Sequence, residues 1–227
     1  MTVSLGIEGR HALVTAGTTQ TGSGCVERLC QEGVAVAFTG EDRERGRSLA
    51  AQTGATFLQC DPTDRAACDR AVARALEAAG GRLDVLVTNG ALLVDGPLEA
   101  TSEAALRELL EANLTAVFRA GRACLGSMRE HGGGSMIHIA STAGVRAVHE
   151  NAAYSVACAG VIAVAELLAA EGARHSVRSN AVCPDPTGVD VAPLVAWLAS
   201  DESAHVSGAT LRVDRAAGAA MVIDTRT

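Results

Sequence analysis

The sequence predicts an α/β fold in which a seven-stranded parallel sheet is flanked by helices, and three observations support this class. Short runs rich in aliphatic and β-branched residues alternate with longer segments of helical periodicity, which is the pattern of successive β-α-β units. Polar capping residues precede the helical segments, and glycines follow them. The 227 residues, 48% hydrophobic and 20% charged, can bury one substantial core. We therefore expect residues 1–227 to form a single domain without internal repeats.

The expected elements follow one another along the chain in strand-helix order. The strands are the short apolar runs His11–Thr15, Ala35–Thr39, Thr56–Gln59, Val85–Thr88, Ser135–Ala140, Val177–Val182 and Thr210–Val213. The helices are the longer periodic segments Ser23–Glu32, Asp42–Gln52, Thr63–Ala79, Ser102–Glu130, Ala152–Ala173 and Pro193–Ser200. Asp61 to Asp64 open the third helix, Thr101 and Ser102 precede the fourth as capping residues, and Gly132 to Gly134 end it.

Composition excludes several classes of function. A net charge of −7 opposes nucleic-acid binding, and an aromatic content of 2% leaves few rings on which bases could stack. The amino-terminal residues do not resemble a targeting segment, and we expect no apolar segment near the roughly 18 residues that a membrane helix needs. The 7 cysteines are scattered without CxxC pairing, so we expect reduced thiols and no metal site. We therefore expect a cytoplasmic protein without membrane or nucleic-acid partners.

Three motifs carry a family resemblance. The segment AGGRLDVLVTNGALL contains Asn89 after the fourth strand, EANLTAVF contains Asn113, and MIHIASTAG ends the fifth strand at Ser141. Tyr154, the only tyrosine of the chain, follows Ser141 by thirteen residues. Together these motifs resemble the short-chain dehydrogenase/reductase family over nearly the whole chain.

The resemblance implies a Rossmann-type, doubly wound sheet with a nicotinamide cofactor at its carboxyl edge. It also implies catalytic roles for Ser141 and Tyr154 and a structural and proton-relay role for Asn113. The family's active tyrosine is followed four residues later by a lysine that lowers its pKa, and this chain has Cys158 there. Because a thiol supplies no positive charge, we expect Tyr154 to stay a protonated donor.

The first loop also departs from the family's TGxxxGxG pattern. Aligned by its distance to the end of the first helix, the loop has Ala16 and Gln20 at two glycine positions, and only Gly22 is in register. An alternative register places Gly17, Gly22 and Gly24 in the loop. These glycines would let the backbone approach a pyrophosphate at a helix amino terminus.

The remaining cofactor contacts favour NAD over NADP, and favour weak binding of either. Glu41 and Asp42 follow the second strand, where a basic residue would meet a 2′-phosphate. Asp61 matches the family's acidic contact to the adenine, whereas Asp185 replaces a glycine beside the nicotinamide and Thr187 is the one candidate to hold its carboxamide. The expectation is no cofactor or weak NAD(H), with NADP(H) disfavoured. If a dinucleotide binds, we expect Gly17, Gly22, Asp61 and Asn89 to hold it.

Several residues near Tyr154 have two interpretations. His149 could act as a base in place of the lysine, or it could be a surface histidine. Cys158 could be nucleophilic or could simply pack, and His138, inside a strand, is expected to be a core residue. Pro186 leads almost directly into the last helix, so the substrate lid of the family is missing and the site should be open unless another chain covers it.

Three functions follow from these observations. The first is a non-redox enzyme of bacterial primary or secondary metabolism, with isomerase, cyclase or lyase chemistry on an oxygenated small molecule and Tyr154 as acid. The second is a silent subunit that pairs with an intact paralogue, and the third is an NAD(H)-dependent ketoreductase or alcohol dehydrogenase. The small, apolar residues of 152–173 favour a homo- or hetero-oligomer in each case.

Overall fold

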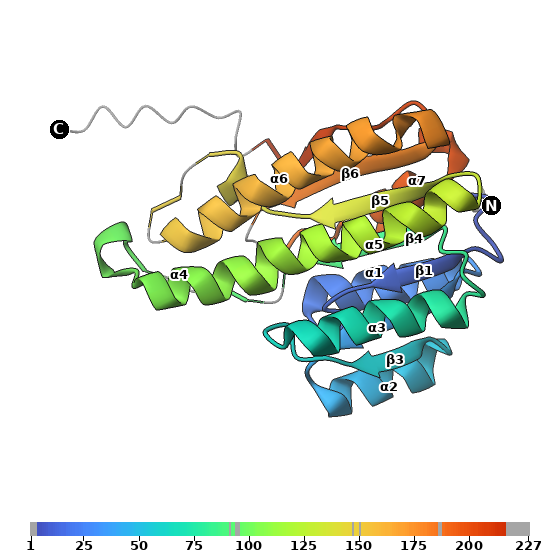
Figure 1. The fold of residues 1–227 in the computed structure, drawn as a ribbon, viewed down its shortest axis with the longest axis horizontal. Coiled ribbons are helices and arrows are strands. Elements are labelled where there is room, and N and C mark those ends of the chain that lie inside the picture. Colours follow the sequence, from blue (N-terminus) through green and yellow to red (C-terminus); the bar gives the residue numbers. More distant parts are fainter. Residues whose placement is uncertain are drawn as a thin grey trace.

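A computed structural model describes residues 4–90, 92–93, 96–146, 148–149, 151–185 and 188–216. Within these residues, one parallel sheet has the strand order β3-β2-β1-β4-β5-β6-β7 (Figure 1). The strands are β1 His11–Val14, β2 Ala35–Gly40, β3 Thr56–Gln59, β4 Val85–Asn89, β5 Gly134–Ile139, β6 Val177–Pro184 and β7 Thr210–Val213. The order reverses between β1 and β4, which confirms the predicted doubly wound α/β fold.

Helices cover both faces of the sheet. The α-helices are α1 Gln20–Gln31, α2 Arg43–Thr53, α3 Arg65–Ala78, α4 Glu103–Leu110, α5 Ala116–Glu130, α6 Ala152–Gly172 and α7 Ala192–Ala199. Side chains of α3, α5 and α6 share one core with the sheet, and those of α1, α2 and α7 share a second core on its other face. Successive side chains of β1 point to opposite faces of the sheet, so Leu13 belongs to the first core and Val14 to the second.

Two helix predictions need correction. Helix α1 begins at Gln20 rather than Ser23, because the Thr19 hydroxyl accepts a hydrogen bond from the Gly22 amide at 3.1 Å and caps the helix earlier. The single helix predicted over Ser102–Glu130 is interrupted by a π-helical turn at Glu111–Thr115. The turn contains Asn113, whose side chain bonds the loop after β4 instead of facing solvent.

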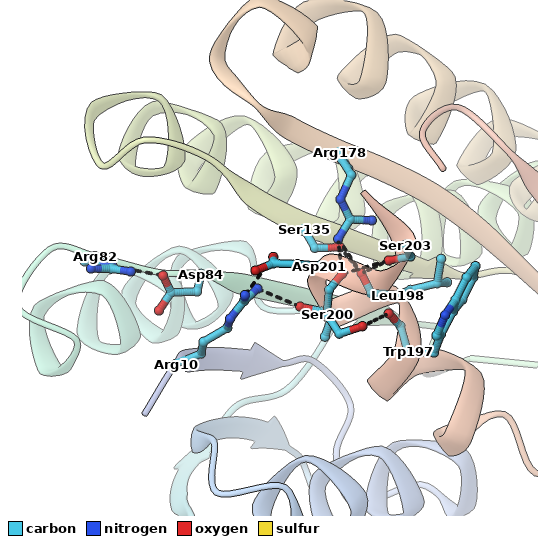
Figure 2. A network of polar contacts seen from close by, with 11 residues as sticks. Arg10, Arg82, Asp84, Ser135, Arg178, Trp197, Leu198, Ser200, Asp201 and Ser203 are labelled. Carbon is cyan, nitrogen blue, oxygen red and sulfur yellow. Dashed lines mark hydrogen bonds and ion pairs between the residues drawn. The ribbon is translucent and has the colours of Figure 1, made fainter. Parts of the chain in front are cut away.

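A network of polar contacts lies at the amino-terminal edge of the sheet (Figure 2). The Arg178 guanidinium and the Ser135 hydroxyl each donate to the Leu198 carbonyl at 2.7 Å, and Arg10 donates to the Ala199 carbonyl and to Asp201 at 2.8 Å. These donors satisfy the last carbonyls of α7, which have no partner within the helix. Open α/β sheets bind their ligands at the opposite, carboxyl edge.

Helix α6 corrects the expectation that no segment is long and apolar enough to span a membrane. The segment Ala152–His175 meets that test of length and composition. Val161, Ala165 and Leu168 are nevertheless buried in the core beside β6. The apolar character of α6 is thus used in packing within the fold.

The connection from β6 to α7 is confined to residues 185–191. Pro186 and Thr187 lie outside the described residues, so the structure says nothing about the carboxamide contact considered for Thr187. So short a connection has no length for a helical lid, as the sequence predicted.

Candidate active site at the carboxyl edge of the sheet

A cavity of about 120 Å³ opens at the carboxyl ends of β1, β2, β3 and β4. Its lining includes Gly40 and Glu41 after β2, Cys60 after β3 and Asn89 at the end of β4. Apolar side chains of α3 and α5 form its floor. The cavity lies where β1 and β4 diverge to opposite halves of the sheet, the position at which open α/β sheets bind ligands.

The first loop keeps a tight turn although Ala16 replaces a glycine. Ala16 has φ of 48°, in the left-handed region that favours glycine. A Cβ on Gly17 would lie 2.7 Å from the Phe38 ring, and a Cβ on Gly22 would lie 2.2 Å from the Ala16 carbonyl oxygen. Both glycines are therefore required by packing, and Gln20 is exposed and is not among the residues that line the cavity. The alanine has not opened the loop.

Asn89 joins this loop to the end of β4. Its side-chain amide donates to the Thr19 hydroxyl at 2.8 Å, and its backbone amide donates to the Thr15 hydroxyl at 3.0 Å. Asp61, beside the cavity, instead accepts hydrogen bonds from the amide and hydroxyl of Thr63 at 2.8 and 2.6 Å. These bonds hold the pKa of Asp61 below its usual value. Asp61 is exposed, whereas its neighbours Cys60 and Pro62 line the cavity.

Ser141, Tyr154 and Cys158 lie together at the end of β5 and the start of α6. The Tyr154 hydroxyl lies close enough to the Cys158 thiol and the Ser141 hydroxyl for both groups to affect its pKa. Burial raises the pKa of Tyr154 well above its usual range, and the neighbouring thiol adds to this shift. Burial also raises the pKa of Cys158 to about 12. Both groups are therefore neutral near pH 7, with Tyr154 available as a proton donor.

A second, smaller cavity of about 20 Å³ adjoins this cluster. Tyr154 and Cys158 line it together with Asn89, Gly90 and Asn113. Asn113 is buried, and its side chain bonds the amide and carbonyl of Leu92 at 3.0 and 2.5 Å. Because Asn89 lines both cavities, the tyrosine cluster and the larger cavity belong to one site along the edge of the sheet.

The two histidines occupy different environments. His149 is exposed in the turn before α6 and is not among the residues that line either cavity. His138 is fully buried in β5, where Nδ1 lies 2.8 Å from the Thr88 hydroxyl. Among the described residues Nε2 of His138 has no hydrogen-bond partner, and burial lowers the pKa of the ring to about 4. His138 therefore lies in the core, as predicted, with one of its two ring nitrogens hydrogen-bonded.

Three cysteines of the site were missed by reasoning from sequence. Cys183, near the end of β6, lies close enough to Tyr154 to affect its pKa, and burial raises the pKa of Cys183 itself to about 11. Cys60 and Cys68 line the larger cavity with their sulfur atoms 3.3 Å apart. The position of Cys60 and Cys183 at strand ends was the available signal, because parallel strands bring their carboxyl ends to one edge.

Comparison with known proteins places this site in a family. The short chain dehydrogenase family profile matches residues 10–196. The chain is 31% identical to the 3-oxoacyl-[acyl-carrier-protein] reductase MabA of Mycobacterium tuberculosis, over 92% of this chain and 93% of that protein. It is 30% identical to the D-threitol dehydrogenase of Mycolicibacterium smegmatis, over 92% of each chain. The crystal structure of a short chain dehydrogenase from Mycobacterium smegmatis superimposes with a TM-score of 0.85 at 33% identity, covering 93% of each chain.

These relatives overturn the expectation of a non-redox enzyme. They are named as reductases and dehydrogenases, and their similarity extends over nearly the whole chain. Neither Cys158 nor Ala16 disrupts the site, because Ser141 and Tyr154 still lie close together and the first loop keeps its tight turn. The chain belongs to the short-chain dehydrogenase family.

Proposed function

We propose that this protein is an oxidoreductase that reduces the carbonyl group of a small ketone or 3-oxoacyl compound to a secondary alcohol. One observation carries the proposal. The hydroxyls of Ser141 and Tyr154 lie close together at the edge of the sheet that also holds the larger cavity, and Asn89 lines both parts of this site. The relatives named as reductases support the same reaction.

The larger cavity fits the adenosine end of a nicotinamide dinucleotide. Gly40 leaves room beside the strand end, Glu41 offers a carboxylate to ribose hydroxyls, and Asn89 closes the far side. The amino terminus of α1 begins just after Thr18 and Thr19, which line the cavity, and the positive end of its dipole suits a pyrophosphate. Glu41 and the neighbouring Asp42 would repel a 2′-phosphate, so NAD(H) is preferred to NADP(H). The bound dinucleotide supplies the hydride.

Ser141 and Tyr154 act on the carbonyl oxygen of the substrate. Two neutral hydroxyls can donate hydrogen bonds to this oxygen and stabilise the negative charge that develops on it. Tyr154 then gives its proton to the alkoxide, a transfer that its raised pKa permits without prior activation. Cys158 brings no charge to the dinucleotide, so the cofactor is held mainly at its adenosine end.

The proposal is tested by measuring turnover and binding separately. Loss of NADH or NADPH absorbance is followed with an acetoacetyl thioester and with simple ketones, and both dinucleotides are titrated by calorimetry. We expect faster turnover with NADH than with NADPH. In Glu41→Arg, turnover with NADH should no longer exceed turnover with NADPH. Absence of both binding and turnover would overturn the proposal and leave the silent-subunit interpretation, which co-purification with a paralogue would then have to support.

Assembly and compartment complete the proposal. The protein is a cytoplasmic, single-domain enzyme that forms a dimer through α5 and α6. Phe118, Val156 and Leu167 on these helices are 41%, 55% and 49% exposed, an apolar surface suited to a twofold partner. Size-exclusion chromatography with light scattering measures the stoichiometry.

A further inference from the structure

Two thiols face each other on the wall of the larger cavity. Cys60 follows β3, and its backbone amide donates to the Gly40 carbonyl at 2.9 Å, which fixes it to the sheet. Cys68 lies in the first turn of α3. Their sulfur atoms are 3.3 Å apart, at hydrogen-bond distance, and both line the cavity beside Glu41.

We infer that Cys60 and Cys68 form a reversible dithiol–disulfide pair, and that its oxidation narrows the cavity and weakens binding of the dinucleotide's adenosine end. The second part of this inference rests on the proposed function. The first part concerns the chemistry of the two thiols alone and is tested independently of any cofactor.

The two thiols are not equivalent. The hydrogen bond from Cys60 holds the pKa of Cys68 below its usual value, and the nearby Arg119 guanidinium acts in the same direction, whereas partial burial opposes both. Arg119 is itself paired with Asp69 and Glu111, at 3.2 and 2.6 Å. The same hydrogen bond raises the pKa of Cys60. Cys68 is therefore the nucleophile, and Cys60 is the thiol that resolves the intermediate.

The reaction needs a peroxide as oxidant. The Cys68 thiolate attacks one peroxide oxygen, the O–O bond breaks, and a sulfenic acid forms on Cys68 as the other oxygen leaves as water after protonation. The Cys60 sulfur then attacks the sulfenic sulfur, releasing a second water and forming the disulfide. The two thiols lose two electrons in total, and the peroxide gains them. A small-molecule dithiol reverses the reaction by thiol–disulfide exchange.

The geometry explains how oxidation reaches the cavity. A disulfide bond is about 2 Å long, so the sulfur atoms must approach each other by about 1 Å. Because Cys60 is fixed to the sheet, the movement draws the first turn of α3 toward the end of β3. Both segments are walls of a cavity of only about 120 Å³.

Mass spectrometry of the intact protein tests the dithiol. After stoichiometric hydrogen peroxide, the wild type and the control Cys30→Ser should lose the mass of two hydrogen atoms and regain it with dithiothreitol. Arg65 separates the cysteines, so trypsin should release two peptides joined only by this disulfide. Cys60→Ser should instead accumulate a sulfenic acid on Cys68 that dimedone captures. The inference would be overturned if Cys68→Ser still lost two thiols on oxidation. It would also be overturned if the wild type formed its disulfide between other cysteines, or formed none.

Titration with NADH tests the coupling to the cavity. Oxidation should raise the dissociation constant about fivefold or more in the wild type and in Cys30→Ser. It should leave the dissociation constant unchanged in Cys68→Ser, which lacks the thiol that reacts with peroxide. An equal affinity in both redox states would refute the coupling. If NADH binds neither state, the proposed function fails, while the mass measurement still decides whether the disulfide forms.

Discussion

At the scale of single residues, the pair Tyr154–Cys158 determines the protonation state in which the proposed reaction begins. Reduction needs a phenol that donates a proton, whereas alcohol oxidation needs a phenolate that accepts one. Burial and the neighbouring Cys158 thiol raise the pKa of Tyr154, so the donor form dominates at neutral pH. With Cys158 in place of the family's lysine, the form of Tyr154 that is populated at neutral pH is therefore the one that ketone reduction uses.

A pH series would detect this preference. The rate of ketone reduction should be nearly constant from about pH 6 to 9, because Tyr154 stays protonated throughout. The rate of alcohol oxidation should rise about tenfold per pH unit over this range, in proportion to the phenolate fraction. Initial rates in both directions measure the two profiles. A plateau in oxidation near neutrality would show that another base takes the proton.

Tyr154→Phe removes only the hydroxyl and keeps the ring in the core. We expect turnover to fall by roughly 10² or more, as for the loss of a general acid. The dissociation constant for NADH and the unfolding temperature should stay close to those of the wild type. A substitution that lowered stability and turnover together would assign Tyr154 a packing role.

His138 makes folding sensitive to acid. Its pKa is about 4 in the folded chain, below the ordinary value of 6.5, because the buried ring resists charging. The unfolded chain therefore binds a proton that the folded chain does not, and stability is lost as pH falls from about 6.5 to about 4. The loss from this one group is about 3 kcal/mol. The free energy of unfolding, measured with urea at each pH, should depend less steeply on pH in His138→Asn than in the wild type. In the control His205→Asn, where the histidine is exposed, it should depend on pH as in the wild type.

At the scale of elements, the sequence predicted the strands better than the helix boundaries. The bounds of β3 and β7 agree with prediction because short apolar runs between polar turns leave one choice. The π-helical turn at Glu111–Thr115 depends on a partner, Leu92, that is distant in sequence, and no local pattern reveals it. The pairing of Cys60 and Cys68 likewise could not be predicted from their spacing, because it depends on the turn that brings the two thiols together.

Gly22 and Gly126 provide a matched pair of helix glycines. A Cβ on Gly22 would meet the Ala16 carbonyl oxygen at 2.2 Å, whereas a Cβ on Gly126 would meet nothing within 4 Å. Gly22→Ala should destabilise the fold by about 2 kcal/mol or more and weaken NADH binding, because the loop must move. Gly126→Ala should stabilise the fold by about 0.5–1 kcal/mol. Denaturant unfolding measures the change in the free energy of unfolding for both variants. If Gly22→Ala changed it no differently from Gly126→Ala, the first loop would tolerate a side chain at this position.

At the scale of the whole molecule, the outer surfaces of α5 and α6 are the proposed dimer interface. Val156 and Leu167 are separated by three helical turns, so they lie on the same side of α6. Val156→Glu and Leu167→Arg should each shift the protein toward monomer in light scattering. Leu98, 78% exposed outside these helices, is the control, and Leu98→Glu should leave the stoichiometry unchanged.

The chain contains a single phenol, and that phenol is Tyr154. In most proteins the near-ultraviolet signal of phenolate formation averages over many tyrosines, so the ionisation of one catalytic group is hidden. Here the alkaline absorbance change of the entire protein comes from the active site, once the constant indole contribution of Trp197 is subtracted. A simple spectrophotometric titration, without labelling or substrate, therefore reads the acidity of the proton that the enzyme is proposed to deliver.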